Sequence, residues 1–545
     1  MKKRVLSLLL TTSVVAAMLA GCGSTSAEPA TTTATESPAP TADTPDSTTT
    51  EAPAGEGAAE EGIDISEPVT LKWYLEGSNV TDDSAVLAEA NAYLKEKLNG
   101  TLEPIWGTWG DFDDNATLSI QSSEDVDIYF TCSWTKNEYN AFSKKGYFLR
   151  LDDPENNLIE KYASDLWNLL PGVLTQGATI NGADGYGVYA VPGYKDIATQ
   201  NCWDVNVPLL EKYGYTIDDI KNADYFSFGE ILETVKKGEG ESFYPLLLEG
   251  AVLERMVDNS IIVTGDCTGN VLSYIIDPAD PSKEGAYGNK LLSKYETEEF
   301  KKFVEQSREY YLAGYIDPAM GNAEQANDTR SAKQLSGEYL IGTQSYSLGY
   351  ELQASQERGF EVAMVPVTPA EIDTTSSQGA MMAISTASKN PERAMMFLNL
   401  LNTDPYLMTL LNYGVEGTHY ELVDGLVQFT DKRSDYQPWT NGMGNVTILT
   451  PTVDQGADFW DGFKNYYGNA VSIPIIGFSF DSTAVEAQAG ALSNVCAQYT
   501  LALEAGTIDP ETALPEFIQK LKDNGIDEYV AEANSQLQTF LDSKN

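Results

Sequence analysis

The sequence predicts an α/β fold, and three features near the start of the folded region predict it. Residues 69–74 alternate between apolar and polar side chains, as a half-buried strand does. Residues 84–98 repeat apolar side chains at helical spacing. Residues 102–106 and 126–131 are again typical of strands. Because strands that alternate with helices pair through right-handed crossovers, we expect an α/β domain here.

Further elements follow along the chain. Apolar spacing predicts helices over 208–213, 298–312, 391–401 and 515–522, and an apparent strand covers 339–343. The cysteines are Cys22, Cys132, Cys202, Cys267 and Cys496. No two of them form a CxxC motif, and the wide spacing of the last four leaves disulfide pairing and redox role open.

The N-terminal segment is typical of an exported lipoprotein. Three basic residues at positions 2–4 precede an apolar run over residues 5–18, and Leu19-Ala20-Gly21-Cys22 follows. This order resembles a signal peptide over residues 1–21 that ends in a lipobox, which makes Cys22 the lipidated first residue of the mature chain. An ordinary signal peptide with a chance cysteine and a short membrane anchor are the alternatives.

A tether is expected between the signal peptide and the folded region, over residues 22–67. From Gly23 to Gly62 the chain is rich in Thr, Pro, Ala and Glu and has no aromatic, branched aliphatic or basic residue. Such a segment buries too little apolar surface to offset the entropy lost on ordering. We therefore expect residues 22–67 to be a disordered acidic tether.

Composition excludes several classes of function. The 545 residues carry 34 Lys and Arg against 81 Asp and Glu, a formal net charge of −47, whereas nucleic-acid binding needs a surplus of cations. His419 is the one histidine, which excludes a metal site built on a histidine pair. No HExxH, GxSxG or Walker motif occurs. Among the 81 carboxylates, nothing selects the acid–base pair of a glycosidase.

Two motifs admit more than one interpretation. Residues 185–190 (GYGVYA) match GxGxxA, but turn residues precede them and Pro192 follows, so a hairpin strand is favoured over a dinucleotide site. Asp111, Asp113, Asp114 and Asn115 form an acidic cluster compatible with calcium. The cluster lacks the Gly and Glu of an EF-hand, so a helix that begins with acidic residues is favoured.

Aromatic residues are the most informative feature for function: there are 30 Tyr and 8 Trp. Flat rings offer apolar faces to the C–H surfaces of sugars, while neighbouring amides and carboxylates bind hydroxyl groups. Several aromatics follow apparent strands, and ligands of open α/β sheets bind at the carboxyl ends of strands. For any single ring, a place in the core fits the sequence equally well. The rings in such positions are Tyr74, Trp106, Trp109, Trp134, Tyr194, Tyr346 and Trp439.

Six short segments, in this order and behind a lipobox, carry a resemblance to a known family. They are residues 71–74 (LKWY), 127–134 (DIYFTCSW), 187–192 (GVYAVP), 209–214 (LLEKYG), 413–420 (YGVEGTHY) and 477–481 (GFSFD). Over residues 68–545 the chain resembles the extracellular solute-binding proteins of ABC sugar importers (family 1), in particular the LipO-like lipoproteins. The part from Gly477 resembles a helical module often attached to these proteins.

The resemblance implies a two-lobed fold of the periplasmic-binding-protein (Venus flytrap) type with ligand between the lobes. Lobe one would comprise residues 68–197 and 373–430, and lobe two residues 198–372 and 431–545 with the helical C-terminal module. Two or three crossing segments would form the hinge. The ligand-binding residues implied by the resemblance and by position are Tyr74, Glu76, Trp109, Trp134, Tyr194, Lys195, Tyr346, Glu416, His419, Trp439 and Asn445. For His419 the alternative is a structural hydrogen-bonding role.

The function implied is that of a lipid-anchored receptor on the extracellular face of a bacterial, Gram-positive cell. It would capture a carbohydrate, an oligosaccharide above all, by hinge closure and deliver it to the transmembrane subunits of an ABC permease. By the same resemblance it would be a monomer and not an enzyme, with no cofactor, no metal and no nucleic-acid partner. The alternatives are a binding protein for a peptide or polyamine, which the acidity suits, and a surface glycosidase.

Overall fold

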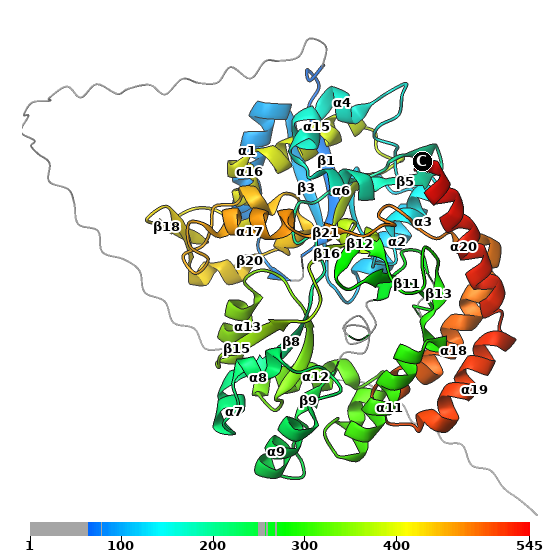
Figure 1. Cartoon of the computed structure of the whole chain (residues 1–545). Coiled ribbons are helices and arrows are strands. Elements are labelled where there is room, and N and C mark those ends of the chain that lie inside the picture. Colours follow the sequence, from blue (N-terminus) through cyan, green and yellow to red (C-terminus); the bar gives the residue numbers. More distant parts are fainter. Residues whose placement is uncertain (1–63, 78, 249–256, 258–259, 267–269, 545) are drawn as a thin grey trace, which may run out of the picture. The chain divides into compact units, whose positions relative to one another are not determined.

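The computed structural model describes residues 64–77, 79–248, 257, 260–266 and 270–544 (Figure 1). The predicted signal peptide, Cys22, residues 22–63 of the predicted tether and Cys267 lie outside the described residues. Among the helices of the described residues, none is both long and apolar enough to cross a membrane.

A five-stranded sheet in the order β3-β1-β4-β17-β7 forms the centre of what we call the first lobe. β1 pairs in parallel with β3 and β4, whereas β17 is antiparallel to β4 and β7. The strands are β1 (Val69–Glu76), β3 (Gly100–Gly107), β4 (Ile128–Thr131), β7 (Val191–Pro192) and β17 (Met381–Ile384). Because β17 lies far along the chain from the other four, two distant parts of the sequence build one sheet.

Helices of the first lobe cover this sheet. α1 buries Val86, Ala90, Leu94 and Leu98, a stripe of every fourth residue, and it spans the residues that the periodicity predicts. The helices are α1 (Ser84–Leu98), α2 (Phe112–Gln121), α3 (Tyr139–Lys144), α4 (Leu158–Tyr162), α5 (Ser164–Leu169), α6 (Gly172–Ala178), α15 (Pro391–Thr403) and α16 (Pro405–Tyr413).

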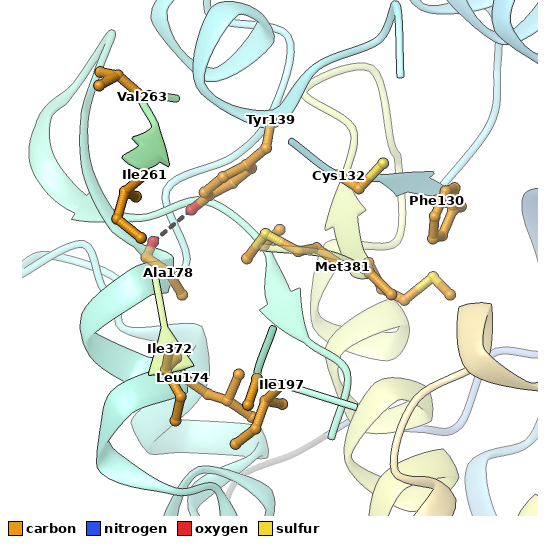
Figure 2. Packing of buried hydrophobic residues seen from close by; sticks show 14 of the residues in the cluster. Phe130, Cys132, Tyr139, Leu174, Ala178, Ile197, Ile261, Val263, Ile372 and Met381 are labelled. Atoms are coloured by element: carbon orange, nitrogen blue, oxygen red, sulfur yellow. Dashed lines mark hydrogen bonds between the residues drawn. The ribbon is translucent and has the colours of Figure 1, made fainter. Parts of the chain in front are cut away.

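The core of the first lobe reaches to the residues that connect it to the rest of the chain. Figure 2 shows Phe130 and Met381 on neighbouring strands, with Ile197 and Ile372 near Leu174. The hydroxyl of Tyr139 in this core donates a hydrogen bond to the Ala178 carbonyl at 2.5 Å. All of these side chains are almost fully buried, so the connecting segments are anchored by apolar packing.

A four-stranded sheet in the order β15-β8-β14-β9 forms the centre of what we call the second lobe. β8 is antiparallel to β14 and β15, and β14 is parallel to β9. The strands are β8 (Asn201–Asn206), β9 (Leu246–Leu247), β14 (Ile341–Ser345) and β15 (Val362–Pro366). The helices around it are α7 (Val207–Lys212), α8 (Ile217–Lys221), α9 (Gly229–Glu239), α12 (Ala326–Ser336) and α13 (Tyr350–Arg358).

A third sheet and the C-terminal helices complete the fold. β11 (Leu272–Asp277) is antiparallel to β10 (Ser260–Ile262), β12 (Asp280–Glu284) and β13 (Leu292–Ser293). α11 (Glu298–Leu312) packs against the C-terminal helices, and Arg308 donates to the Gly506 carbonyl at 2.9 Å. These helices, side by side in Figure 1, are α18 (Glu486–Glu504), α19 (Pro510–Asp523) and α20 (Ile526–Ser543).

The chain passes between the two lobes twice. Residues 193–200, the first crossing, lead from β7 to β8, and residues 367–380, the second crossing, lead from β15 to β17. The crossings are bonded to each other: Thr199 and Glu371 exchange backbone hydrogen bonds of 2.7 and 3.0 Å. The second crossing contains β16 (Glu371–Ile372) and α14 (Thr374–Ser377), and β16 pairs in parallel with β21 (Val471–Ser472). Three segments therefore run beside one another at the junction.

The predicted boundary at residue 431 differs from the packing. β20 (Tyr436–Gln437) pairs with β2 (Asn79–Val80), and the Tyr436 hydroxyl donates to the Leu411 carbonyl at 2.7 Å. The chain from residue 431 therefore continues along the first lobe, because its aromatic side chains complete that lobe's core. The other elements of the described residues are α17 (Phe459–Gly468) and the hairpins β5 (Thr179–Gly182) with β6 (Gly185–Val188) and β18 (Tyr420–Val423) with β19 (Leu426–Phe429). Short 3-10 helices are η1 (Lys294–Glu296), η2 (Pro318–Gly321), η3 (Asp431–Asp435), η4 (Thr440–Gly442), η5 (Val446–Ile448) and η6 (Ser482–Val485).

Candidate ligand-binding groove

Three of the predicted tryptophans meet at one edge of the first sheet. Trp109 follows β3, Trp134 follows β4 and Trp439 follows β20. Their ring centroids lie 5.5 Å (Trp109–Trp134), 5.1 Å (Trp109–Trp439) and 6.0 Å (Trp134–Trp439) apart. Trp109 is 48% and Trp134 50% exposed, so about half of each side chain faces solvent. We call these three residues the tryptophan cluster.

The geometry of the tryptophan cluster is that of a corner rather than a stack. The rings of Trp109 and Trp134 are tilted by 39° to each other, and each is steeply inclined to Trp439, by 74° and 81°. The buried ring of Phe130 lies beneath, 5.5 Å from Trp439. Exposed indole faces set at an angle form a concave apolar surface that suits the C–H face of a sugar ring.

Hydrogen bonds hold Trp134 against the second crossing. Its indole N–H donates to the Gly379 carbonyl at 2.9 Å, and the preceding Ser133 donates from its backbone N–H to Gln378 at 3.1 Å and from its hydroxyl to Thr375 at 2.9 Å. The loop after β4 is therefore fixed by three bonds to residues 375–379. A ring held in this way loses little further entropy when a ligand packs on it.

The acidic cluster before the tryptophan loop begins a helix, as predicted. Asp111 precedes α2 and accepts from the backbone N–H and the hydroxyl of Thr108, both at 2.8 Å, and these bonds lower its pKa. Asp113 lies in the first turn, and Asp114 pairs with Lys136 at 2.5 Å. In the described ranges, no three Asp, Glu, Cys or His side chains are grouped so as to hold a metal.

Two predicted residues lie on the first crossing. The Tyr194 carbonyl accepts from the Val446 N–H at 3.0 Å, and its ring lies 6.4 Å from Phe463 of α17. The Lys195 ammonium donates to the neighbouring carboxylate of Asp196 at 2.6 Å. Asp196 in turn accepts from the Ser347 hydroxyl at 3.0 Å, which ties the first crossing to the end of β14.

Tyr346 lies directly after β14, at the edge of the second lobe. Its backbone N–H donates to the Gln200 carbonyl at 2.7 Å, and its ring lies 5.7 Å from Tyr466 of α17. Burial raises the pKa of Tyr346 to about 12, so its hydroxyl stays protonated at neutral pH. The Tyr466 hydroxyl donates to the Gln200 side chain at 2.5 Å. These tyrosines are half-buried and engaged, unlike the exposed tryptophans.

A groove of about 640 Å³ lies at the junction of the lobes, and none of the three tryptophans of the cluster is among its lining residues. Thr440 and Asn441, which directly follow Trp439, line it. The second lobe contributes Tyr350, Gln353 and Gln356 from one face of α13. Helix α17 contributes aromatic rings, namely those of Phe459, Trp460, Phe463 and Tyr467. We call this the inter-lobe groove. Its size lies within the range of about 300–1,000 Å³ typical of ligand sites.

None of the predicted ligand-binding residues is among the residues that line the inter-lobe groove. The missed residues of greatest interest are Tyr350, Gln353, Gln356, Arg433, Asp454, Phe459 and Trp460. The spacing of Tyr350, Gln353 and Gln356 places them on one helix face, which was a usable signal. Trp460 is one of eight tryptophans, so its residue type was a second usable signal.

Arg433 supports the wall of the groove. Its guanidinium donates to the carbonyls of Asn412 and Tyr436, both at 2.7 Å, and lies 4.8 Å from the centroid of the Phe429 ring. Burial lowers its pKa to about 10, so it remains a cation at neutral pH. Because backbone carbonyls already accept from its N–H groups, Arg433 mainly stabilises the wall of the groove.

Other predicted site residues have structural placements. Tyr74 is buried and stacks on Tyr129 with ring centroids 5.8 Å apart, and Glu76 is 4% exposed, so a position facing the ligand is not supported for either. Both belong to β1, a central strand covered on both sides by helices. Burial of their side chains therefore follows from the sheet order, which the local sequence did not reveal.

Of the remaining three predicted residues, two are buried and one is exposed. His419 is 4% exposed and its Nδ1 accepts from the Val415 N–H at 2.9 Å, the structural alternative. Asn445 is buried, caps η5 by accepting from Thr447 at 3.1 Å, and donates to the Asn402 carbonyl at 3.2 Å. Glu416 is exposed, forms an isolated bridge with Tyr420 and, like the other predicted residues, does not line the inter-lobe groove.

The sequence is similar to that of a known transport component. A carbohydrate ABC transporter substrate-binding protein of Streptococcus pneumoniae is 27% identical over 493 residues, which cover 90% of this chain and 94% of the relative. A crystal structure of the N-glycan transport solute binding protein (NgtS) of Streptococcus pneumoniae, also 27% identical, covers 88% of this chain and 100% of its own, with a TM-score of 0.74.

The chain has the fold of an ABC-transporter solute-binding protein. The predicted two-lobed α/β fold is thereby confirmed, as is the resemblance on which it rested. NgtS in complex with Man5GlcNAc is 26% identical and gives a lower TM-score of 0.65 over the same 88% of the chain. The relatives are substrate-binding components of transporters rather than enzymes.

The C-terminal helices match a family model of their own. A model described as a domain of unknown function (DUF3502) matches residues 474–542, which include α18, α19 and α20. The match begins close to Gly477, where the sequence predicts the start of a helical module. The matched segment therefore consists mainly of the three C-terminal helices.

Proposed function

We propose that this solute-binding protein captures an oligosaccharide for an ABC importer, with the tryptophan cluster and the separate inter-lobe groove, which Thr440 and Asn441 next to Trp439 line, as the binding surfaces. The observation that carries the proposal is the tryptophan cluster, in which three indoles from separate loops converge with two of them about half exposed. Apolar residues of this size rarely lie exposed together without a ligand to cover them. The amide and hydroxyl side chains along the groove supply hydrogen bonds for sugar hydroxyls.

An N-glycan fragment is the ligand class that best fits this site. NgtS has been crystallised with Man1GlcNAc and with Man5GlcNAc. The inter-lobe groove is lined by α13, by α17 and by Thr440 and Asn441, and its volume of about 640 Å³ has room for more than one sugar unit. Its lining combines aromatic rings and amide and hydroxyl groups with the charged side chains of Asp196, Asp454 and Arg433. Asp196 is already paired with Lys195, and aromatic rings beside amide and hydroxyl groups suit a neutral oligosaccharide.

Capture by hinge closure completes the proposed mechanism. The lobes are connected at the bonded crossings, and a sugar on the tryptophan cluster would gain contacts from α13 when the groove narrows. The closed, loaded form is the one we expect the transmembrane permease subunits to accept.

A ligand screen by thermal unfolding tests capture. Man1GlcNAc and Man5GlcNAc should raise the unfolding temperature of the mature chain, because a ligand at 100 times its Kd adds about 2.7 kcal/mol to the folded state. Product analysis of the same samples should find the sugars intact. Release of shorter sugars would instead indicate a glycosidase, and stabilisation by spermidine or peptides alone would overturn the carbohydrate proposal.

Anchoring through Cys22 is the second part of the proposal. The lipobox-like Leu19-Ala20-Gly21-Cys22 supports cleavage before Cys22 and attachment of lipid to its sulfur on the extracellular face. In a Gram-positive host, the wild-type chain should sediment with membranes, whereas Cys22→Ser should be released into the medium. Equal membrane retention of the two would leave the signal segment itself as the anchor.

A further inference from the structure

A second hollow lies on the first lobe, formed by a different set of residues from the inter-lobe groove. It has a volume of about 480 Å³, and its walls are α4, α5, α6 and the β5–β6 hairpin. None of its lining residues is shared with the inter-lobe groove. Its volume lies in the range of about 300–1,000 Å³ that small-molecule sites occupy.

The chemistry of this hollow combines one indole with uncharged polar side chains. Trp167 is half-buried in its wall, and Ser164, Asn168 and Gln176 beside it are exposed. Within the described part of the chain, none of these four side chains makes a hydrogen bond to another residue. An aromatic face next to unused hydroxyl and amide groups is what recognition of a sugar ring requires.

The walls of the hollow are held rigidly. Asn157 caps α4 by accepting from the Glu160 N–H at 2.9 Å, and the Leu166 N–H of α5 donates to the Asn399 side chain at 3.1 Å. The Thr179 hydroxyl donates to the Thr175 carbonyl at 2.7 Å. Residues other than Ser164, Asn168 and Gln176 make the bonds that hold the walls. These three side chains therefore remain available to bind a ligand, in a site that is formed before the ligand arrives.

Charge narrows the choice of ligand. The lining contains two carboxylates, Asp152 and Glu160, and no cationic side chain, which disfavours anions. Asp152 is already engaged: its Oδ1 accepts from the Arg150 Nε–H and the Val188 N–H, both at 2.9 Å. With that charge partly neutralised, a neutral polyhydroxyl ligand fits the site better than a polyamine does.

We propose that this hollow is a second carbohydrate site, in which the ring of a neutral saccharide packs on Trp167 and hydrogen-bonds to Asn168 and Gln176. This inference goes beyond capture in the inter-lobe groove and does not depend on it. A shallow site with one aromatic ring binds weakly, so it would retain sugars near the receptor rather than commit them to transport.

The test follows each tryptophan of the mature chain separately. The eight tryptophans are labelled with 5-fluorotryptophan, and their 19F resonances are assigned by single Trp→Phe variants. The chain is titrated with mannose, N-acetylglucosamine and Man1GlcNAc, and separately with spermidine. Trp167 reports the second hollow, Trp134 reports the tryptophan cluster, and Trp73 and Trp203, which are 1% and 2% exposed, serve as internal controls.

The Trp167 resonance should shift saturably with at least one neutral sugar, in the wild type and equally in Trp134→Ala. Asn168→Ala and Gln176→Ala, both at exposed positions, should each weaken this binding about threefold to tenfold, the effect of one neutral hydrogen bond. Tyr186→Ala on the adjacent strand β6 is the matched control: this ring is 61% exposed but does not line the hollow, and its loss should change nothing.

Several results would overturn the second site. A Trp167 resonance that stays fixed with every sugar while Trp134 moves would refute it and leave the proposed function intact. A shift with spermidine alone would identify a cation site, and a shift lost in Trp134→Ala or unchanged in Gln176→Ala would show that Trp167 only senses events elsewhere. Movement of Trp167 without Trp134 would instead refute capture at the tryptophan cluster and leave the second site standing.

Discussion

The central strands of the two lobes are both buried, but their side chains differ: one strand is largely apolar, and the other carries several polar residues. β4 of the first lobe reads Ile-Tyr-Phe-Thr and is buried over its whole length with a largely apolar set of side chains. β8 of the second lobe is also buried throughout but reads Asn-Cys-Trp-Asp-Val-Asn. A carboxylate in such a place needs a partner, and Asp204 has Arg358 at 2.8 Å and the Tyr339 hydroxyl at 2.7 Å.

The difference shows how each lobe presents its part of the groove. Apolar β4 ends in a loop that carries Trp134 and is fixed by bonds to the second crossing. Polar β8 instead fixes a helix: Arg358 lies at the C-terminal end of α13, and its guanidinium also reaches the hydroxyl of Tyr350 at the start of that helix, at 3.3 Å. The first lobe thus offers exposed rings, and the second offers a helix face held by a buried ion pair.

The largest expected effect comes from breaking that ion pair. Arg358→Leu leaves the Asp204 carboxylate buried without its cation, which we expect to lower the free energy of unfolding by about 3–5 kcal/mol. Denaturant unfolding followed by circular dichroism measures it. The double variant Asp204→Leu/Arg358→Leu should recover most of the loss, because an apolar pair needs no charge partner.

An exposed ion pair of the first lobe provides the matched control. Lys136 and Asp114 are 61% and 74% exposed, and Lys136→Leu should change the unfolding free energy by less than about 1 kcal/mol. If Arg358→Leu lowered the free energy of unfolding no more than Lys136→Leu does, the buried ion pair of the second lobe would not stabilise the protein more than the exposed pair of the first lobe does.

The second effect concerns ligand affinity. Trp134→Ala removes a half-exposed indole from the centre of the tryptophan cluster and should weaken oligosaccharide binding by about 2 kcal/mol, roughly thirtyfold. Isothermal titration calorimetry with Man5GlcNAc measures it. Phe226→Ala, at a ring of the second lobe that is 43% exposed and outside the inter-lobe groove, should bind as the wild type does. Equal affinity of Trp134→Ala would remove the first lobe's rings from the site.

A smaller effect is expected on the second lobe's side. Tyr346→Phe keeps the half-buried ring and its contact with Tyr466, and removes only a hydroxyl. We expect affinity for Man5GlcNAc to fall about twofold to fivefold, which the same calorimetry resolves. A loss as large as that of Trp134→Ala would mean that the second lobe contributes as strongly as the first.

The smallest effect is a pH dependence confined to the first lobe. Burial, and after it the charge of Arg433, lower the pKa of His419 below its ordinary value near 6.5. Between pH 6.5 and that lowered pKa, the unfolded chain therefore binds a proton at His419 and the folded chain does not. The free energy of unfolding falls as the pH drops through this range. Unfolding midpoints of wild type and His419→Asn between pH 7.5 and 5 should show a shallower decline for the variant. Parallel curves would contradict this assignment.

Local patterns along the chain were enough for several helices and strands in more than one part of the fold. α1 and α11 span the predicted residues 84–98 and 298–312, and the GxGxxA segment forms the predicted hairpin strand. Such elements depend on periodicity within a single window, which the sequence displays directly. The placement of residues 431–437 on the first lobe was not foreseeable in this way, because it depends on β20 pairing with a strand far away in the chain.

For the site, the sequence by itself determined the kind of residue: aromatic rings that follow strands, in a chain with the order of segments of a solute-binding protein. The tertiary structure decided which of these rings lie together and exposed. It brought Trp109, Trp134 and Trp439 together and buried Tyr74, His419 and Asn445, and it added α13 and α17 to the groove. The physical reason is that exposure depends on what covers a side chain. That covering comes from distant segments, which no local pattern contains.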